Sequence, residues 1–395
     1  MSTPKAGAHL APASLDDVAR EKLAALERRA LRRRLVTTDR PGAVEAQRDG
    51  ATLVSFSCND YLGLTHHPDV IAASVEATQR YGVGAGSSRL VNGNHPLYAG
   101  LERKLATLKG AEDAVVFGSG YLTNLGVIPA LVGRADLILL DELCHSCLLA
   151  GAELSHAHVL EFRHNDVGHL AELLTNERPR HRHCLVLTDG VFSMEGDLAP
   201  LPALAALSAQ HDAWLMTDDA HGLGVVGGGR GSSFAHGAPV GVPLQMGTLS
   251  KAVGGYGGYL CASRSVCELV RNRARTFVYS TGLPPGVVAA ASRALDVIAS
   301  DHALVERPLA RARAFTAALH LPPAVSPIVS LVLGGAEHTL HASEALRRAG
   351  FLVAAIRPPT VPPGTSRLRV TFSAAHTSAQ VAALAGAVRP LLRDA

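Results

Sequence analysis

One lysine of this sequence stands in a segment suited to covalent chemistry. Lys251 follows the hydroxyl residues Thr248 and Ser250 and precedes a glycine-rich run from Gly254 to Gly258. Apolar residues flank the segment on both sides, so we expect one strand before it and another after it. Burial disfavours the charged form of an amine and lowers its pKa from about 10.4, which makes the lysine a nucleophile for aldehydes. Taken by itself, the segment also fits a surface lysine in a tight turn.

A buried acid is the second group that this chemistry requires. Pyridoxal phosphate is an electron-sink cofactor that condenses with a lysine, and a carboxylate beside its ring nitrogen keeps that nitrogen protonated. Asp218 and Asp219 are adjacent candidates for this carboxylate, and strand periodicity does not distinguish between them. Either residue alone also fits a helix N-cap or a salt-bridge partner.

Groups for the phosphate and for the face of the ring come from other segments. Gly120 and Tyr121 stand at the predicted start of a helix, where backbone N–H groups and the helix dipole attract a phosphate. Thr248 offers a hydroxyl to the same phosphate. His145, at the predicted start of the next helix, offers a flat ring that stacks on the cofactor. Each group alone also fits a structural role, and their joint placement favours the cofactor site.

These residues share one position relative to the predicted strands. Short apolar runs alternate with helical patterns, which is typical of a mainly parallel sheet covered by helices on both faces. Ligands of such sheets bind beyond the carboxyl ends of the strands, where all of the groups above lie. The predicted strands are Ala114–Phe117, Leu137–Leu140, His158–Glu161, Cys184–Thr188, Ala213–Thr217, Leu244–Gly247 and Gly258–Cys261.

The predicted organisation is a large α/β domain followed by a smaller α+β domain. We expect an N-terminal helical segment over 1–50, with a helix over 14–35, a cofactor-binding domain over 51–285 and a small domain over 286–395. The small domain is predicted from strands at 328–333, 351–356 and 368–372 and from helices at 338–349 and 377–393.

Composition and charge narrow the class of protein. The 395 residues are 47% hydrophobic and carry a net charge of +3, which indicates a large core and no nucleic-acid partner. No apolar run reaches the roughly 18 residues that span a membrane, and residues 1–12 lack an apolar signal segment, so we expect a cytoplasmic protein. Cys144 and Cys147 have metal or redox spacing, but no second pair completes a site. We expect reduced thiols and no metal.

Six segments together resemble one enzyme family. They read SCNDYLGL from Ser57, HNDVGHL from His164, DGVFSMEGD from Asp189, TDDAHGLGVVG from Thr217, GTLSKAVGGYGG from Gly247 and YSTGLPP from Tyr279. The combination resembles the α-oxoamine synthases, fold-type I pyridoxal-phosphate enzymes that join an amino acid to an acyl thioester with loss of CO₂. The resemblance covers the chain from about residue 20 onward and implies a large domain with a seven-stranded sheet and a small C-terminal domain.

The resemblance implies a role for each residue at the cofactor. Lys251 would hold the cofactor, remove the α-proton of the amino acid and reprotonate the product. Asp218, three residues before His221, would pair with the ring nitrogen. The resemblance thus selects Asp218 over Asp219, a choice that periodicity leaves open. His221 and Ser193 would contact the ring oxygen, and His145 would stack on the ring. The phosphate would be bound by Gly120, Tyr121 and Thr248, and by Ser280 and Thr281 from the second subunit of a homodimer.

The resemblance also implies the residues that bind the substrates. Arg357 would bind the amino-acid carboxylate as a planar fork, and Asn59 would line the same site. Arg32 and Thr360 would serve the acyl substrate, and His145 would also take part in substrate binding.

Two segments point to one branch of the family. Ala355–Arg369 resembles the branch that condenses L-alanine with a pimeloyl thioester in biotin biosynthesis, and Ser87–His95 points the same way. The alternative is another branch, such as glycine C-acetyltransferase; a non-catalytic protein on the same fold is a more distant one. The pimeloyl group would arrive on coenzyme A or on an acyl carrier protein, and the basic run from Arg28 to Arg34 would suit an acidic carrier.

Overall fold

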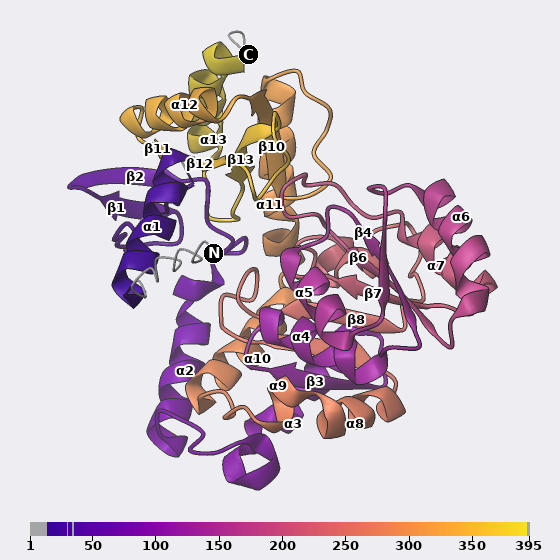
Figure 1. Cartoon of the computed structure of the whole chain (residues 1–395). Coiled ribbons are helices and arrows are strands. Elements are labelled where there is room, and N and C mark those ends of the chain that lie inside the picture. Colours follow the sequence, from indigo (N-terminus) through magenta and orange to yellow (C-terminus); the bar gives the residue numbers. More distant parts are fainter. Residues whose placement is uncertain (1–13, 30, 34, 393–395) are drawn as a thin grey trace, which may run out of the picture.

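The chain folds into a large lobe and a smaller lobe (Figure 1). The structure is a computed structural model, and it describes residues 14–29, 31–33 and 35–392. The large lobe is built on a seven-stranded sheet, and the smaller lobe carries two three-stranded sheets. Within the described ranges, no helix is both long and apolar enough to cross a membrane. The expected cytoplasmic location stays a prediction.

The large sheet contains the strands expected from the sequence. They are β3 (Asp113–Phe117), β4 (Leu137–Asp141), β5 (His158–Phe162), β6 (Cys184–Asp189), β7 (Trp214–Asp218), β8 (Leu244–Thr248) and β9 (Gly258–Ala262). They lie in the order β3-β9-β8-β7-β6-β4-β5. β9 runs antiparallel to its neighbours β3 and β8, and the strands from β8 to β5 pair in parallel. The mainly parallel α/β fold is therefore confirmed.

Helices cover both faces of this sheet. They are α2 (Pro68–Tyr81), α3 (Leu97–Lys109), α4 (Gly120–Leu131), α5 (Ser146–Ser155), α6 (Val167–Glu177), α7 (Leu201–Gln210), α8 (Arg264–Arg273), α9 (Arg275–Val278) and α10 (Pro285–Ser300). Every residue of β4 is buried, and its side chains alternate between the faces. Leu137 and Leu139 pack in the cluster that contains α6 and α7, whereas Ile138 and Leu140 pack in the cluster that contains α4 and α5. Burial on both faces explains the continuous apolar runs in the sequence.

The smaller lobe combines segments from both ends of the chain. Its strands are β1 (Glu45–Arg48), β2 (Ala51–Ser55), β10 (Ile328–Gly334), β11 (Phe351–Leu352), β12 (Ala354–Ile356) and β13 (Ser366–Thr371), and its helices are α11 (His302–Ala318), α12 (Ala336–Arg348) and α13 (Ser378–Val388). One sheet has the order β1-β2-β11, and the other has the order β10-β13-β12. The ring of Phe372 packs in the core of this lobe against two other rings, with its centroid 5.7 Å from that of Phe56 and 5.2 Å from that of Phe315.

The structure corrects the strand predicted over 351–356. It divides at Val353, because β11 pairs in parallel with β2 whereas β12 pairs antiparallel with β13. The segment therefore passes from one sheet to the other, which an apolar run does not reveal. β2 lies at the start of the predicted large domain but contributes to the sheet that β11 completes, as the neighbouring labels in Figure 1 show. The domain boundaries at 50 and 285 stay predictions.

The N-terminal helix is shorter than expected. α1 (Leu15–Arg28) begins at a capping box formed by Ser14 and Asp17, and none of its residues is buried. The predicted helix continues to residue 35, but Ala30 and Arg34 lie outside the described residues. Arginines four apart, such as Arg29 and Arg33, repel each other on a helix, and no buried face offsets that repulsion here. This combination explains why the helix ends at Arg28.

A buried ion pair joins α3 to the segment after β7. The ammonium of Lys109 lies 2.6 Å from a carboxylate oxygen of Asp219, and neither side chain is exposed to solvent. Lys109 also donates to the carbonyl oxygen of Arg230 at 2.8 Å. The backbone N–H of Ser232 donates to the same carboxylate at 3.0 Å. These contacts fix the position of the chain next to Asp218.

We expect replacement of Lys109 by Met to destabilise the large lobe by about 3–5 kcal/mol, because it leaves the Asp219 carboxylate buried without its cation. Urea unfolding followed by fluorescence of Trp214, the single tryptophan, measures the change. Lys104→Met is the matched control on the same helix. Lys104 lies 2.7 Å from Asp296 with both side chains about two-fifths exposed, so its loss should cost about 1 kcal/mol or less. Equal losses for the two variants would contradict the role of the buried pair.

A histidine bridge ties together loops at the carboxyl edge of the large sheet. His164 Nδ1 lies 3.1 Å from Asp141 and its Nε2 lies 2.9 Å from Asp197. Partial burial disfavours the imidazolium, but the hydrogen bonds and charges of the two carboxylates outweigh it and raise the pKa of His164 to about 10. The charged ring therefore connects the last residue of β4 to the segment before α7.

This raised pKa predicts a pH window for the bridge. Its stabilising contribution is fully present below the unfolded pKa of about 6.5 and is lost as the pH rises through about 10. We expect His164→Asn to lower the midpoint of thermal unfolding most at about pH 6, with a difference from the unsubstituted protein that shrinks toward about pH 10. A difference that stays constant between these two pH values would contradict the assignment of charge to His164.

Candidate active site

Lys251 lies at the wall of a cavity of about 200 Å³ at the carboxyl edge of the large sheet. It follows β8 by three residues, in the loop that leads to β9. The walls also contain most of the residues expected at the cofactor, namely Gly120, Tyr121, His145, Asp218, His221 and Thr248. These residues come from segments that are far apart in sequence, and the strand ends bring them together as the sheet rule predicts.

The amine of Lys251 is in a setting that favours its neutral form. Burial lowers its pKa, and the guanidinium of Arg369 lowers it further. The carboxylates of Asp218 and Asp189 act in the opposite direction but do not reverse the shift. A lysine with a lowered pKa offers a free electron pair to an aldehyde nearer neutral pH than an exposed lysine does.

Asp218 and Asp219 face different surroundings. Asp218 lines the cavity, and its carboxylate accepts hydrogen bonds from the side chain of Asn124 at 2.8 Å and from the backbone N–H of Ala220 at 3.0 Å. Asp219 is bound to Lys109, outside the cavity walls. The geometry therefore offers Asp218 to a ligand and gives Asp219 a structural role.

A second carboxyl group lies beside Asp218. Asp189 ends β6 in register with Asp218 at the end of β7, and it also lines the cavity. Burial raises the pKa of Asp189 well above its usual range, and the neighbouring charge of Asp218 adds to the effect. Both effects favour the neutral form of Asp189, and its carboxyl oxygen accepts from the backbone N–H of His145 at 3.3 Å.

The opposite end of the cavity begins at the N-terminus of α4. Ser119 caps this helix by accepting from the N–H of Leu122, so the N–H groups of Gly120 and Tyr121 remain available at the helix end. A Cβ atom on Gly120 would lie 3.1 Å from Thr248, which explains the glycine at this position. The Thr248 hydroxyl donates to the carbonyl oxygen of Gly257 at 2.8 Å. The Ser250 hydroxyl lies 2.8 Å from the Thr248 hydroxyl. An anion at this helix end would meet N–H groups, a positive dipole and the Ser250 hydroxyl.

His145 is the N-cap of α5, and that position fixes its ring. Its Nδ1 accepts from the backbone N–H of Cys147 at 3.3 Å and lies 2.8 Å from the Cys147 sulfur. Burial lowers the pKa of His145. The ring is therefore neutral and immobilised at the wall, as a group that stacks on a flat ligand requires.

His221 is held by a tyrosine that the sequence does not single out. The hydroxyl of Tyr61 lies 2.7 Å from His221 Nδ1. Burial raises the pKa of Tyr61 to about 12 and lowers the pKa of His221 well below its usual value. Both groups are therefore neutral, and we assign the Tyr61 proton to this bond, which leaves the imidazole proton on Nε2. His221 can then donate from Nε2 to a ligand in the cavity.

Arg369 is a second residue that the sequence analysis did not assign. It lies on β13 with only 6% of its surface exposed, and its guanidinium donates to the side-chain oxygen of Asn59 at 3.3 Å. It also donates to the carbonyl oxygen of Ser193. Its charge acts on Lys251 and His221. Every residue of β13 is buried, including Arg367 and Arg369. Two arginines two positions apart in a predicted buried strand are the signal that could have indicated a functional cation.

A larger cavity of about 800 Å³ adjoins the first one at His145, which lines both. Ser193 and Thr360 lie on its wall rather than on that of the smaller cavity. Arg29 and Arg33 also line it, whereas Arg32 points elsewhere and pairs with Glu27 at 3.1 Å. The predicted role of Arg32 in acyl binding stays a prediction, and its two neighbours are better placed for it.

The remaining predicted residues lie away from the small cavity. Arg357 follows β12 and is partly buried, in the loop whose next residues line the larger cavity. Ser280 and Thr281 line a separate small cavity near Tyr98 and Phe277. They could serve a cofactor only from another subunit, and that role also stays a prediction.

The residues present fit pyridoxal phosphate. Lys251 offers an amine with a lowered pKa to the aldehyde, Asp218 a carboxylate to the ring nitrogen, and the start of α4 an anion site to the phosphate. His145 offers a flat ring, and His221 offers a proton on Nε2. The cofactor needs each of these groups for a different reason, and one cavity brings them together.

Comparisons with known proteins give the family. The family model of class I and II aminotransferases matches residues 51–388. A protein of Beijerinckia indica subsp. indica named 8-amino-7-oxononanoate synthase is 59% identical, with coverage of 96% of this chain and 98% of the relative. A protein of the same name from Granulibacter bethesdensis is 58% identical, with coverage of 96% of this chain and 99% of the relative.

Solved structures agree with this assignment. A serine palmitoyltransferase from S. paucimobilis with a bound PLP–myriocin adduct has a TM-score of 0.88 at 32% identity, over 96% of this chain and 97% of that chain. The 8-amino-7-oxononanoate synthase of Francisella tularensis has a TM-score of 0.73 at 25% identity, over 87% of this chain and 97% of that chain. On the family match and the identities together, the chain belongs to the class I and II aminotransferase family and, within it, to the 8-amino-7-oxononanoate synthases.

Proposed function

We propose that the protein condenses L-alanine with a pimeloyl thioester to give 8-amino-7-oxononanoate, CO₂ and a free thiol, in biotin biosynthesis. The observation that carries the proposal is the cavity whose walls combine a lysine of lowered pKa, the side chain of Asp218 and a helix N-terminus. The identity to relatives named for this activity selects it among the reactions that such a cavity supports.

Pyridoxal phosphate, when bound, withdraws electrons from the amino acid so that its α-proton and its carboxyl group can leave. Lys251 Nζ lies at the cavity wall with a lowered pKa, so it takes the α-proton of alanine and later returns a proton to the product. The carboxylate of Asp218 holds a proton on the ring nitrogen, and Asn124 orients that carboxylate. His221 donates from Nε2 because Tyr61 occupies its Nδ1.

We propose that the larger cavity receives the acyl chain. Its wall combines apolar residues such as Leu149 and Met194 with Arg29 and Arg33, and it meets the small cavity at His145. Apolar walls suit the methylene groups of a pimeloyl chain, and guanidinium groups suit carboxylate or phosphate oxygens. Coenzyme A and an acyl carrier protein both present a phosphate at the end of the thioester arm. The basic residues therefore support both donors.

We propose a homodimer with shared sites. Ser280 is partly buried and Thr281 is exposed in this chain, and both lie outside the cavity of Lys251. Large apolar side chains nearby are exposed, including Val91 at 77% and Tyr279 at 74%. Exposed apolar side chains of this size are typical of a surface that another subunit covers. A second copy would bring Ser280 and Thr281 to the phosphate of the first, as expected from the sequence.

We expect purified protein with pyridoxal phosphate to release thiol from pimeloyl-CoA and L-alanine, with a second product of the mass of 8-amino-7-oxononanoate. A parallel reaction with acetyl-CoA and glycine should release none. Lys251→Ala should abolish release, and borohydride reduction should attach the cofactor to the unsubstituted protein but not to this variant. Lys104→Ala is the control, because Lys104 lies on the surface of α3 away from the cavity.

Three results would change this proposal in different ways. Release only with acetyl-CoA and glycine would place the protein in another branch of the family. Release that requires a pimeloyl carrier protein would identify the donor. Retained turnover in Lys251→Ala would overturn the proposed site.

We propose that Arg369, rather than the expected Arg357, is the main ligand of the alanine carboxylate. Arg369 contacts Asn59 and acts on Lys251, whereas Arg357 lies in the loop at the larger cavity. Arg369→Lys keeps the charge but loses the planar fork, so KM for L-alanine should rise about 10- to 100-fold, the equivalent of one charged hydrogen bond. Cofactor absorbance should be retained. A larger rise in Arg357→Lys would return the role to Arg357.

A further inference from the structure

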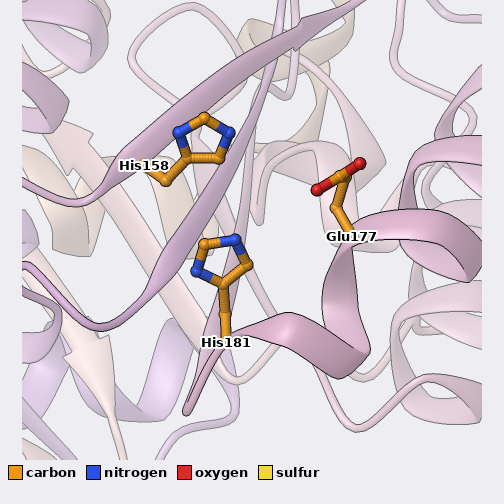
Figure 2. A group of neighbouring side chains, drawn as sticks. All are labelled: His158, Glu177 and His181. Carbon is orange, nitrogen blue, oxygen red and sulfur yellow. The ribbon is translucent and has the colours of Figure 1, made fainter.

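Three potential metal ligands converge on the large lobe away from the active site. His158 begins β5, Glu177 ends α6, and His181 lies just before β6. Figure 2 shows the rings of His158 and His181 one above the other, with the carboxylate of Glu177 to one side of the space between them. One ligand atom from each of the three lies within 4.8 Å of the other two.

The spacing is close to that of a metal site. Zinc binds imidazole nitrogen and carboxylate oxygen at about 2.0–2.2 Å, which places tetrahedral ligand atoms about 3.3–3.5 Å apart. The imidazole rings of His158 and His181 are nearly parallel, with centroids 5.3 Å apart. Rotations of the three side chains that move their ligand atoms by roughly an ångström would therefore complete the zinc geometry without movement of the backbone.

The backbone that carries these ligands is firmly held. Glu177 and His181 stand at the two ends of a single turn, η3 (Arg178–Arg180). Arg178 fixes this turn, because its guanidinium donates to the carbonyl of His181 at 2.8 Å and to the carboxylate of Asp212 at 2.9 Å. His158 is fixed by the pairing of β5 with β4. A site with pre-positioned ligands loses little conformational entropy when it binds an ion.

One neighbour competes for the carboxylate. The guanidinium of Arg180 lies 2.9 and 3.0 Å from the two oxygens of Glu177, in a pair whose arginine is 68% exposed. An exposed ion pair of this kind contributes little stability, about 1 kcal/mol or less. A bound cation would displace it, and Arg180 would return to solvent.

We propose that His158, Glu177 and His181 bind a divalent transition metal of the zinc class, with water in the remaining position. Two imidazoles and one carboxylate suit Zn²⁺ and its neighbours in the first row better than Mg²⁺ or Ca²⁺. The site lies at the amino end of the strands, whereas the catalytic cavity lies at their carboxyl end. The metal is therefore a structural clamp that joins the edge strand β5 to the turn before β6.

Titration of the holoenzyme with ZnCl₂ by calorimetry tests the proposal. We expect one Zn²⁺ per chain, loss of this binding in His158→Ala and in His181→Ala, and weaker binding in Glu177→Gln. Arg180→Ala should bind more tightly, because it frees the carboxylate of Glu177 from its competitor. His183→Ala is the matched control, since His183 stacks on Trp214 and is outside the group of three. It should bind as the unsubstituted protein does.

Independent readouts separate a metal site from a folding defect. Zn²⁺ should raise the thermal midpoint of the unsubstituted holoenzyme and not that of His158→Ala. Ni²⁺ should also raise the thermal midpoint of the unsubstituted holoenzyme, and this rise should require His181. Thiol release should be unchanged in all of these variants. Equal Zn²⁺ binding with and without His158 and His181, or no one-site binding in the unsubstituted protein, would overturn the proposal.

Discussion

The active site depends on the way in which charge is distributed over a small buried volume. Asp189 and Asp218 lie side by side at the ends of neighbouring strands, and their charges and that of Arg369 act on Lys251. Few charges can be retained in such a volume, because each one costs desolvation energy. Burial therefore shifts the pKa values of Lys251, Asp189 and His221 toward their neutral forms. The large sheet brings Asp189, Asp218 and Lys251 to one edge, and β13 of the smaller lobe adds Arg369.

The polar groups at the cavity are fixed by partners that lie one step further from it. Tyr61 fixes the proton of His221, Asn124 orients Asp218, and the N–H of Cys147 fixes His145. None of these partners needs to react. They hold the reacting groups in single orientations, so that little reorganisation is needed when a substrate binds. The Lys109–Asp219 pair extends the same support to the chain beside Asp218.

The large sheet was predictable, because its strands are continuous apolar runs and its helices have caps or prolines at their starts. The strand ends then indicated Asp218, His145 and Lys251. Arg369 was missed because its chemistry depends on a strand of the smaller lobe that meets Asn59 across the fold. β1 was missed because Glu45–Arg48 contains a single buried residue, Ala46. Contacts between distant segments leave no period in the sequence, and they account for most of what could not be foreseen.

The pairing of β2 with β11 has a consequence for synthesis of the chain. Almost 300 residues separate the paired positions Val54 and Phe351, so the sheet that contains β1 and β2 is completed only after this long stretch has been synthesised. The large sheet, in contrast, can form from a central stretch that has already left the ribosome. Until β11 has been synthesised, β1 and β2 therefore form a pair in which one edge of β2 has no partner strand. Short strands with charged residues, as in β1, limit the risk that such an incomplete sheet pairs with another nascent chain.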